Sequence, residues 1–164
     1  MIPQFEGLQQ EEIDLMYDSI PMITLLIGGA DGNLDQDEQQ WAVKITKIRS
    51  YTYEDAMKDF YLELGERYQG RLSHMVENYP KDTEQRGQAI SNDLSGLNAV
   101  LAKLDLEFAA SFYKDLRSFA THVAKASGGF LRFGSISNAE KQWLELPMLT
   151  PIEIEQEEGE QEAE

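Results

Sequence analysis

Four carboxylates fall within eight residues near the start of the chain: Asp31, Asp35, Asp37 and Glu38. Asp31 precedes Gly32, a common turn pair, and Asp35 and Glu38 have the spacing of a helix-starting capping box. Oxygens of Asp31, Asp35 and Glu38 could also converge on a hard divalent cation, since calcium takes six to eight oxygen ligands at about 2.3 to 2.6 Å. The segment is therefore a candidate calcium or magnesium site.

This loop is not an EF-hand, because the first and third ligand positions would fall on Ile27 and Gly29, which offer no side-chain oxygen. A site made from the loop alone would be weak and well hydrated. Alternatively, the carboxylates only cap the next helix, since such a cap stabilises by about 1 kcal/mol without any ligand. The two hypotheses differ in whether the carboxylates bind backbone amides or point together into solvent.

A degraded copy of the acidic segment returns near the end of the chain. The alignment joins four pairs of identical residues: Gly32 with Gly134, Glu38 with Glu140, Gln40 with Gln142, and Trp41 with Trp143. Each copy follows a long apolar helical pattern, makes a glycine-centred turn and opens a new helix. We therefore expect an internal pseudo-two-fold repeat, with the two tryptophans buried in equivalent pockets.

Helical periodicity predicts the elements that position both copies. Apolar residues recur at spacings of three and four, which is one face of an α-helix. The predicted helices cover residues 9–27 with an interruption at Pro21, 35–49, 53–68 with a stop at Gly70, 72–79, 82–103, 105–126 and 138–146. In the second of these, Trp41, Ile45 and Ile48 should be buried. The fold class is all-α, a single compact bundle of about six to seven helices.

Charge and composition narrow the class of partner. Thirty acidic against 14 basic residues give a net charge of −16, which argues against nucleic acid and favours cations or basic proteins. No apolar run approaches the roughly 20 residues that span a bilayer, and we expect a cytoplasmic protein without direct membrane insertion. Residues 152–164 contain seven Glu and no basic residue, so a helical domain of residues 1–150 should precede a disordered acidic tail, 151–164.

The sequence gives little indication of a catalytic site. The chain has no Cys, and His74 and His122 are its only histidines, so neither a zinc site nor a nucleophile–base pair is indicated. The glycines at 28, 29 and 32 follow a predicted helix rather than a strand, and the loop is acidic where a phosphate would bind. We expect a protein that is not an enzyme.

The motif residues resemble the TerB family of tellurite-resistance proteins over residues 8–147. A helix ends in small residues and is followed by Ala30-Asp31-Gly32-x-Leu34-Asp35-x-x-Glu38, and Gly134-x-Ile136-Ser137-x-x-Glu140 follows the fifth long pattern. The second copy departs from the family at Phe133, where an Asp is expected. Members of the family are small all-α domains with internal pseudo-symmetry, and their acidic residues after the first helix are regarded as a candidate metal site.

By position, the resemblance implies a metal site at Asp31, Asp35, Glu38 and Glu140. It further implies a non-enzymatic module that binds a divalent cation, calcium or magnesium, weakly at the acidic loop. The module would dock a protein partner, basic or membrane-associated, in a stress or metal-oxyanion resistance context. The alternative is a protein-interaction or structural helical domain without metal, in which the acidic loops serve only as helix caps.

Overall fold

The computed structural model describes residues 2–30, 34, 36–52, 55–128 and 138–154. Every regular element among them is helical, which confirms the predicted all-α bundle. In chain order the elements are η1 (Pro3–Phe5), α1 (Gln10–Ile23), η2 (Thr24–Gly28), α2 (Gln36–Thr52), α3 (Asp55–Asn78), α4 (Thr83–Ser95), α5 (Leu97–Leu101), α6 (Leu106–Gly128) and α7 (Asn138–Trp143). No helix in these ranges is both long enough and apolar enough to cross a membrane.

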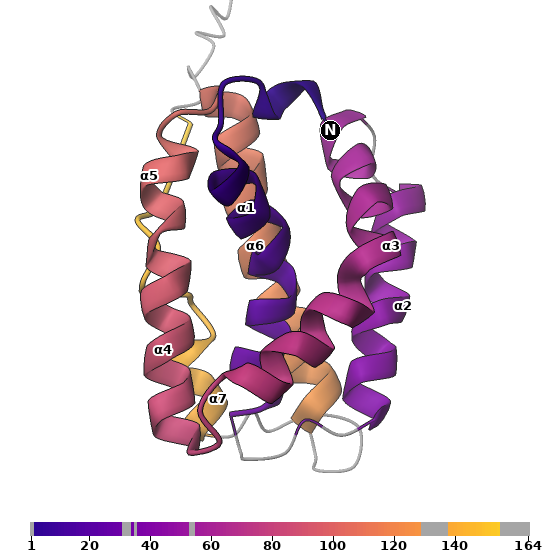
Figure 1. The fold of residues 1–164 in the computed structure, drawn as a ribbon, viewed down its shortest axis with the longest axis vertical. Coiled ribbons are helices and arrows are strands. Elements are labelled where there is room, and N and C mark those ends of the chain that lie inside the picture. Colours follow the sequence, from indigo (N-terminus) through magenta and orange to yellow (C-terminus); the bar gives the residue numbers. More distant parts are fainter. Residues whose placement is uncertain (1, 31–33, 35, 53–54, 129–137, 155–164) are drawn as a thin grey trace, which may run out of the picture.

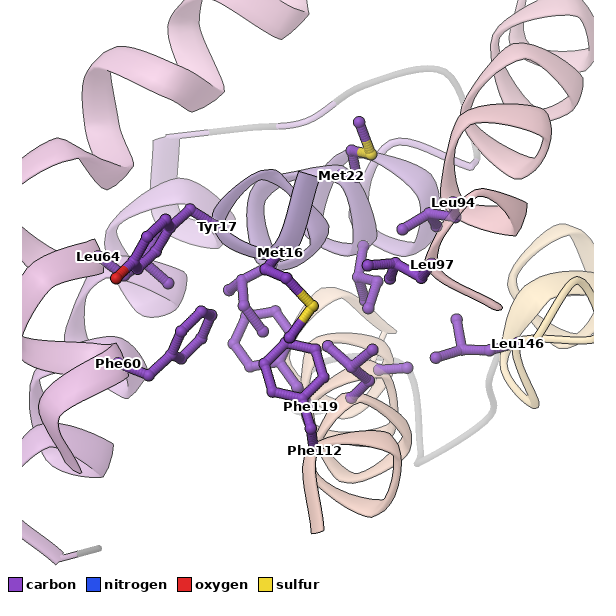
Figure 2. Close-up of a cluster of buried hydrophobic side chains, with 14 of the residues drawn as sticks. Met16, Tyr17, Met22, Phe60, Leu64, Leu94, Leu97, Phe112, Phe119 and Leu146 are labelled. Carbon is purple, nitrogen blue, oxygen red and sulfur yellow. The ribbon is translucent and has the colours of Figure 1, made fainter. Parts of the chain in front are cut away.

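Helices α1 and α6 lie at the centre of the bundle, with α2 and α3 on one flank and α4, α5 and α7 on the other (Figure 1). The core between them is aromatic and aliphatic (Figure 2). The Phe60 ring stacks on Tyr17 and meets Phe112 edge to face, each at a centroid distance of 5.1 Å. The apolar face predicted for residues 105–126 is confirmed, since Phe112 and Phe119 are fully buried.

Pro21 changes the first helix without ending it. Proline has no amide to bond the carbonyl of Tyr17, and α1 passes two residues later into the π-helical turn η2. Within this turn, the Thr24 hydroxyl donates to the Ile20 carbonyl at 3.0 Å and lies 2.6 Å from the Tyr68 hydroxyl. The predicted interruption therefore takes the form of a wider turn that buries residues 24–28.

Two predicted helix boundaries are wrong. Helix α3 continues through Gly70 to Asn78, so neither the stop at Gly70 nor a separate turn at 72–79 exists. A glycine inside a helix costs about 1 kcal/mol relative to alanine, and the buried side chains of Tyr68 and Leu72 on either side of Gly70 offset this cost. Conversely, the predicted helix 82–103 divides at Gly96 into α4 and α5.

Several apolar residues in and just after the two motif copies are less buried than predicted. Trp41 and Trp143 are only partly buried, at the edge of the core, and Ile45 is partly buried as well. Ile48 is 43% exposed, so its predicted burial is wrong. The helices after the two loops have 17 and six residues, and the pseudo-two-fold relation of the loops themselves stays a prediction, because residues 31–33 and 129–137 lie outside the described residues.

Candidate functional site

The predicted metal ligands lie outside the described part of the chain. This holds for Asp31 and Asp35 entirely, and for the side chains of Glu38 and Glu140 in the first turns of α2 and α7. Among the residues that the structure does describe, no group of three His, Cys, Asp or Glu side chains could hold a metal ion. A cation at these four positions stays a prediction.

The described flanks of both motif copies meet at one end of the bundle. Helix α7 packs on η2, which leads into the first copy. A Cβ added to Gly28 would lie 2.8 Å from Leu34 Cδ1 and 3.6 Å from Val123 Cγ1. Because Leu34 follows the first loop and Val123 lies on the helix before the second, glycine at 28 lets these two segments approach η2 closely.

Arg86 of α4 reaches the start of the acidic loop. Its guanidinium donates to the carbonyl oxygen of Gly29, and also to that of Lys81 at 3.5 Å. Gly29 lies two residues before Asp31 in the sequence, and the chain geometry allows at most about 7 Å between the Cα atoms of these two residues. A positive charge therefore lies at the carbonyl of Gly29, where the acidic segment begins, although no basic residue is near this position in the sequence.

A cavity of about 240 Å³ opens beside Arg86, between η2, the first two turns of α4 and the C-terminal end of α7. Its lining includes Ala30 from the first motif copy and Trp143 from the second. The Trp143 indole lies against Gly87, where an added Cβ would be 3.1 Å from both Cζ2 and Nε1. One cavity thus joins residues of both copies, which sequence reasoning related only by similarity.

A second polar cluster is buried between α2, α3 and α6. Arg49 forms an ion pair with Asp115, and the two side chains are 6% and 5% exposed. The Tyr61 hydroxyl donates to the other carboxylate oxygen of Asp115 at 2.5 Å. Arg49 also lies 3.3 Å from Ser118 Oγ and 3.2 Å from His122 Nδ1. These bonds satisfy a buried charge pair and fix the position of α2 on α6.

Sequence reasoning missed this cluster, because Arg49 and Asp115 are 66 residues apart. One signal was present: Asp115 falls on the apolar face of its helix, between Phe112 and Phe119, where a carboxylate needs a partner. His122 lies at the exposed edge of the cluster, with its Nδ1 3.2 Å from the Arg49 guanidinium.

The contact between α1 and α3 carries further ionisable groups. The Tyr17 hydroxyl donates to the carboxylate of Glu63 and holds the pKa of Glu63 below its ordinary value. Burial, and then this same bond, raise the pKa of Tyr17. Nearby, Arg71 pairs with both Asp14 and Asp18. These contacts join the helix before the acidic loop to the longest helix of the bundle.

Comparison with known proteins finds no relative: no family model, no curated protein and no solved structure matches this chain. The resemblance to the TerB family therefore rests on the motif residues alone. What the geometry adds is the convergence of both motif flanks on one end of the bundle.

Proposed function

We propose that this chain is a cytoplasmic, non-enzymatic, TerB-like helical module that binds a divalent cation weakly at its first acidic loop and docks a protein partner. The observation that supports it is the meeting of both motif flanks around the cavity beside Arg86. Two loops whose flanks meet at one end of a bundle can form a single binding surface. The stress or metal-oxyanion context rests on the resemblance alone.

Arg86 bears on the affinity of the proposed cation site. Repulsion among the clustered carboxylates of residues 31–38 favours a bound divalent ion, and the nearby guanidinium relieves part of that repulsion. A unit charge about 8 Å from a divalent ion repels it by about 1 kcal/mol in water, or about fivefold in affinity. We therefore expect a weak site, filled at millimolar cation, that tightens when this charge is removed.

The test is thermal unfolding of the full chain with increasing calcium or magnesium. A bound cation at ten times its dissociation constant stabilises by about 1.4 kcal/mol. This gain should vanish in the double variant Asp31→Asn, Glu38→Gln. The charge-matched control is Asp59→Asn, Glu66→Gln, two exposed carboxylates on α3, and it should retain the gain.

Equal stabilisation of wild type and the loop variant would show general charge screening, and the cation site would be wrong. Arg86→Gln should tighten binding about fivefold, by the charge argument above. Arg86→Lys keeps the charge and should bind like wild type. If both Arg86 variants change the affinity equally, the contact with Gly29, rather than the charge, controls the loop.

The second candidate function is an interaction module whose acidic loops only cap helices. Capping by Asp elsewhere in the chain favours it. Asp82 accepts from the Gln85 amide at 2.8 Å, and Asp105 accepts from the amides of Glu107 and Phe108 at 3.0 and 3.1 Å. If Asp35 is used in the same way, it is not available to a cation, and the titration above separates the two functions.

A further inference from the structure

Helix α2 presents a basic and apolar face to solvent, although the chain is strongly acidic. Residues 39–53 contain three basic residues and no acidic one. Lys44, Lys47, Ile48 and Tyr51 are spaced at 0, 3, 4 and 7, which is one face of a helix. All four are exposed, Ile48 by 43% and Tyr51 by 82%. The face therefore combines positive charge with apolar surface. We call the exposed surface formed by Lys44, Lys47, Ile48 and Tyr51 the α2 face.

The opposite side of α2 is held firmly. Ala42, Thr46 and Arg49 are buried, and Arg49 is paired with Asp115 inside the bundle. The α2 face is thus preformed, and a partner that binds it causes little loss of conformational entropy on this side. Tyrosine is enriched among the residues that carry binding energy in interfaces, and complementary charges around such residues supply specificity.

We propose that the α2 face binds an acidic, partly apolar segment of another protein. Its carboxylates would lie opposite the lysines, and its apolar side chains would cover Ile48 and Tyr51. This inference rests on the partner-docking half of the proposed function and does not involve the cation. The negative net charge of the whole chain predicts a basic partner. The positive charge of this face predicts an acidic partner instead.

The size of the face favours a short segment over a long polyanion. From Lys44 to Tyr51 the stripe on α2 is about 10 Å long, which is two helical turns. A nucleic acid or an anionic membrane would extend beyond it and meet the field of a chain with net charge −16. The acidic end of this chain fits poorly, because residues 155–164 contain no large apolar residue to cover Ile48 and Tyr51.

The test uses the full chain and a synthetic amphipathic peptide that carries Glu on one face and Leu and Phe on the other. Amide NMR should show that the peptide perturbs residues 44–51. The charge reversal Lys44→Glu, Lys47→Glu should weaken binding by about tenfold or more, and Tyr51→Ala by several-fold. The matched control Arg67→Glu, Lys141→Glu reverses two exposed charges on other helices and should leave binding within about twofold.

Several outcomes would overturn the proposal. The first is that millimolar peptide does not perturb the face. The second is that a peptide with Lys in place of Glu binds as tightly as the acidic peptide. The third is that a single-stranded oligonucleotide or phosphatidylserine vesicles bind more tightly than the acidic peptide. Binding of a peptide of residues 155–164 as tight as that of the amphipathic one would assign the face to the chain's own end. The Lys44→Glu, Lys47→Glu variant should be stabilised by calcium or magnesium as much as wild type. Only the loop variant Asp31→Asn, Glu38→Gln should lose this stabilisation, so the cation site and the docking face are tested separately.

Discussion

Replacing Arg49 by Met should lower the free energy of unfolding by about 3 to 5 kcal/mol, because it leaves a buried carboxylate without its cation. The Asp115 side chain is 5% exposed, so water offers it little compensation. The Tyr61 hydroxyl remains as a donor to one carboxylate oxygen, and the other oxygen loses the Arg49 guanidinium. For a domain of this length, such a loss corresponds to a fall in Tm of about 6 to 20 °C.

Urea denaturation followed by circular dichroism measures this effect, and two variants bracket it. Arg117→Met breaks the Arg117–Glu145 pair, whose side chains are 43% and 80% exposed, and should cost at most about 1 kcal/mol. The double variant Arg49→Met, Asp115→Leu removes both charges of the buried pair and should recover part of the loss. A single Arg49→Met variant no less stable than the Arg117→Met control would show that the carboxylate is hydrated, and the reasoning would fail.

Two further predictions concern packing and pH. Gly87→Ala should lower the free energy of unfolding, measured by urea denaturation, by about 1 to 3 kcal/mol, because the added Cβ would crowd the Trp143 indole. Its control is Gly65→Ala on α3, where an added Cβ meets nothing within 4 Å. This change should stabilise the helix by up to about 1 kcal/mol. Because the pKa of Glu63 is lower in the folded protein than its ordinary value of 4.5, the ionised carboxylate stabilises the fold at pH values above 4.5. This stabilisation is lost as the pH falls toward the lowered pKa, because the unfolded chain takes up the proton first. Urea midpoints measured from pH 6 to pH 3 should therefore fall less steeply in Tyr17→Phe, and an unchanged slope would assign the acid sensitivity to other groups.

Local features of the helices could be read from the sequence. The apolar face of α6 follows from a spacing of three and four that any helix places on one side, and its start follows from the cap at Asp105. Glycines were less informative. Gly70 and Gly96 carry the same local signal, yet α3 continues through the first and α4 ends at the second. The difference depends on which neighbouring side chains are buried by other helices.

The metal-site hypothesis for Asp31, Asp35, Glu38 and Glu140 came from motif spacing and still rests on it. The exposure of Ile48 could not be anticipated, because its position in the apolar pattern of α2 resembles a core position. Helix α2 lies at the edge of the bundle, beside α3 and α6, and buries only part of its circumference (Figure 1). A pattern of apolar residues does not tell how many helices surround a helix.

The sequence by itself determined the all-helical class and most helix positions, because periodicity and caps are local properties of a chain. Only the tertiary structure decided which charges meet. Arg86 bonds to Gly29 across 57 residues, and Arg49 pairs with Asp115 across 66. Such pairs form because helix packing brings distant faces together, and no spacing along one helix records which other face it will meet.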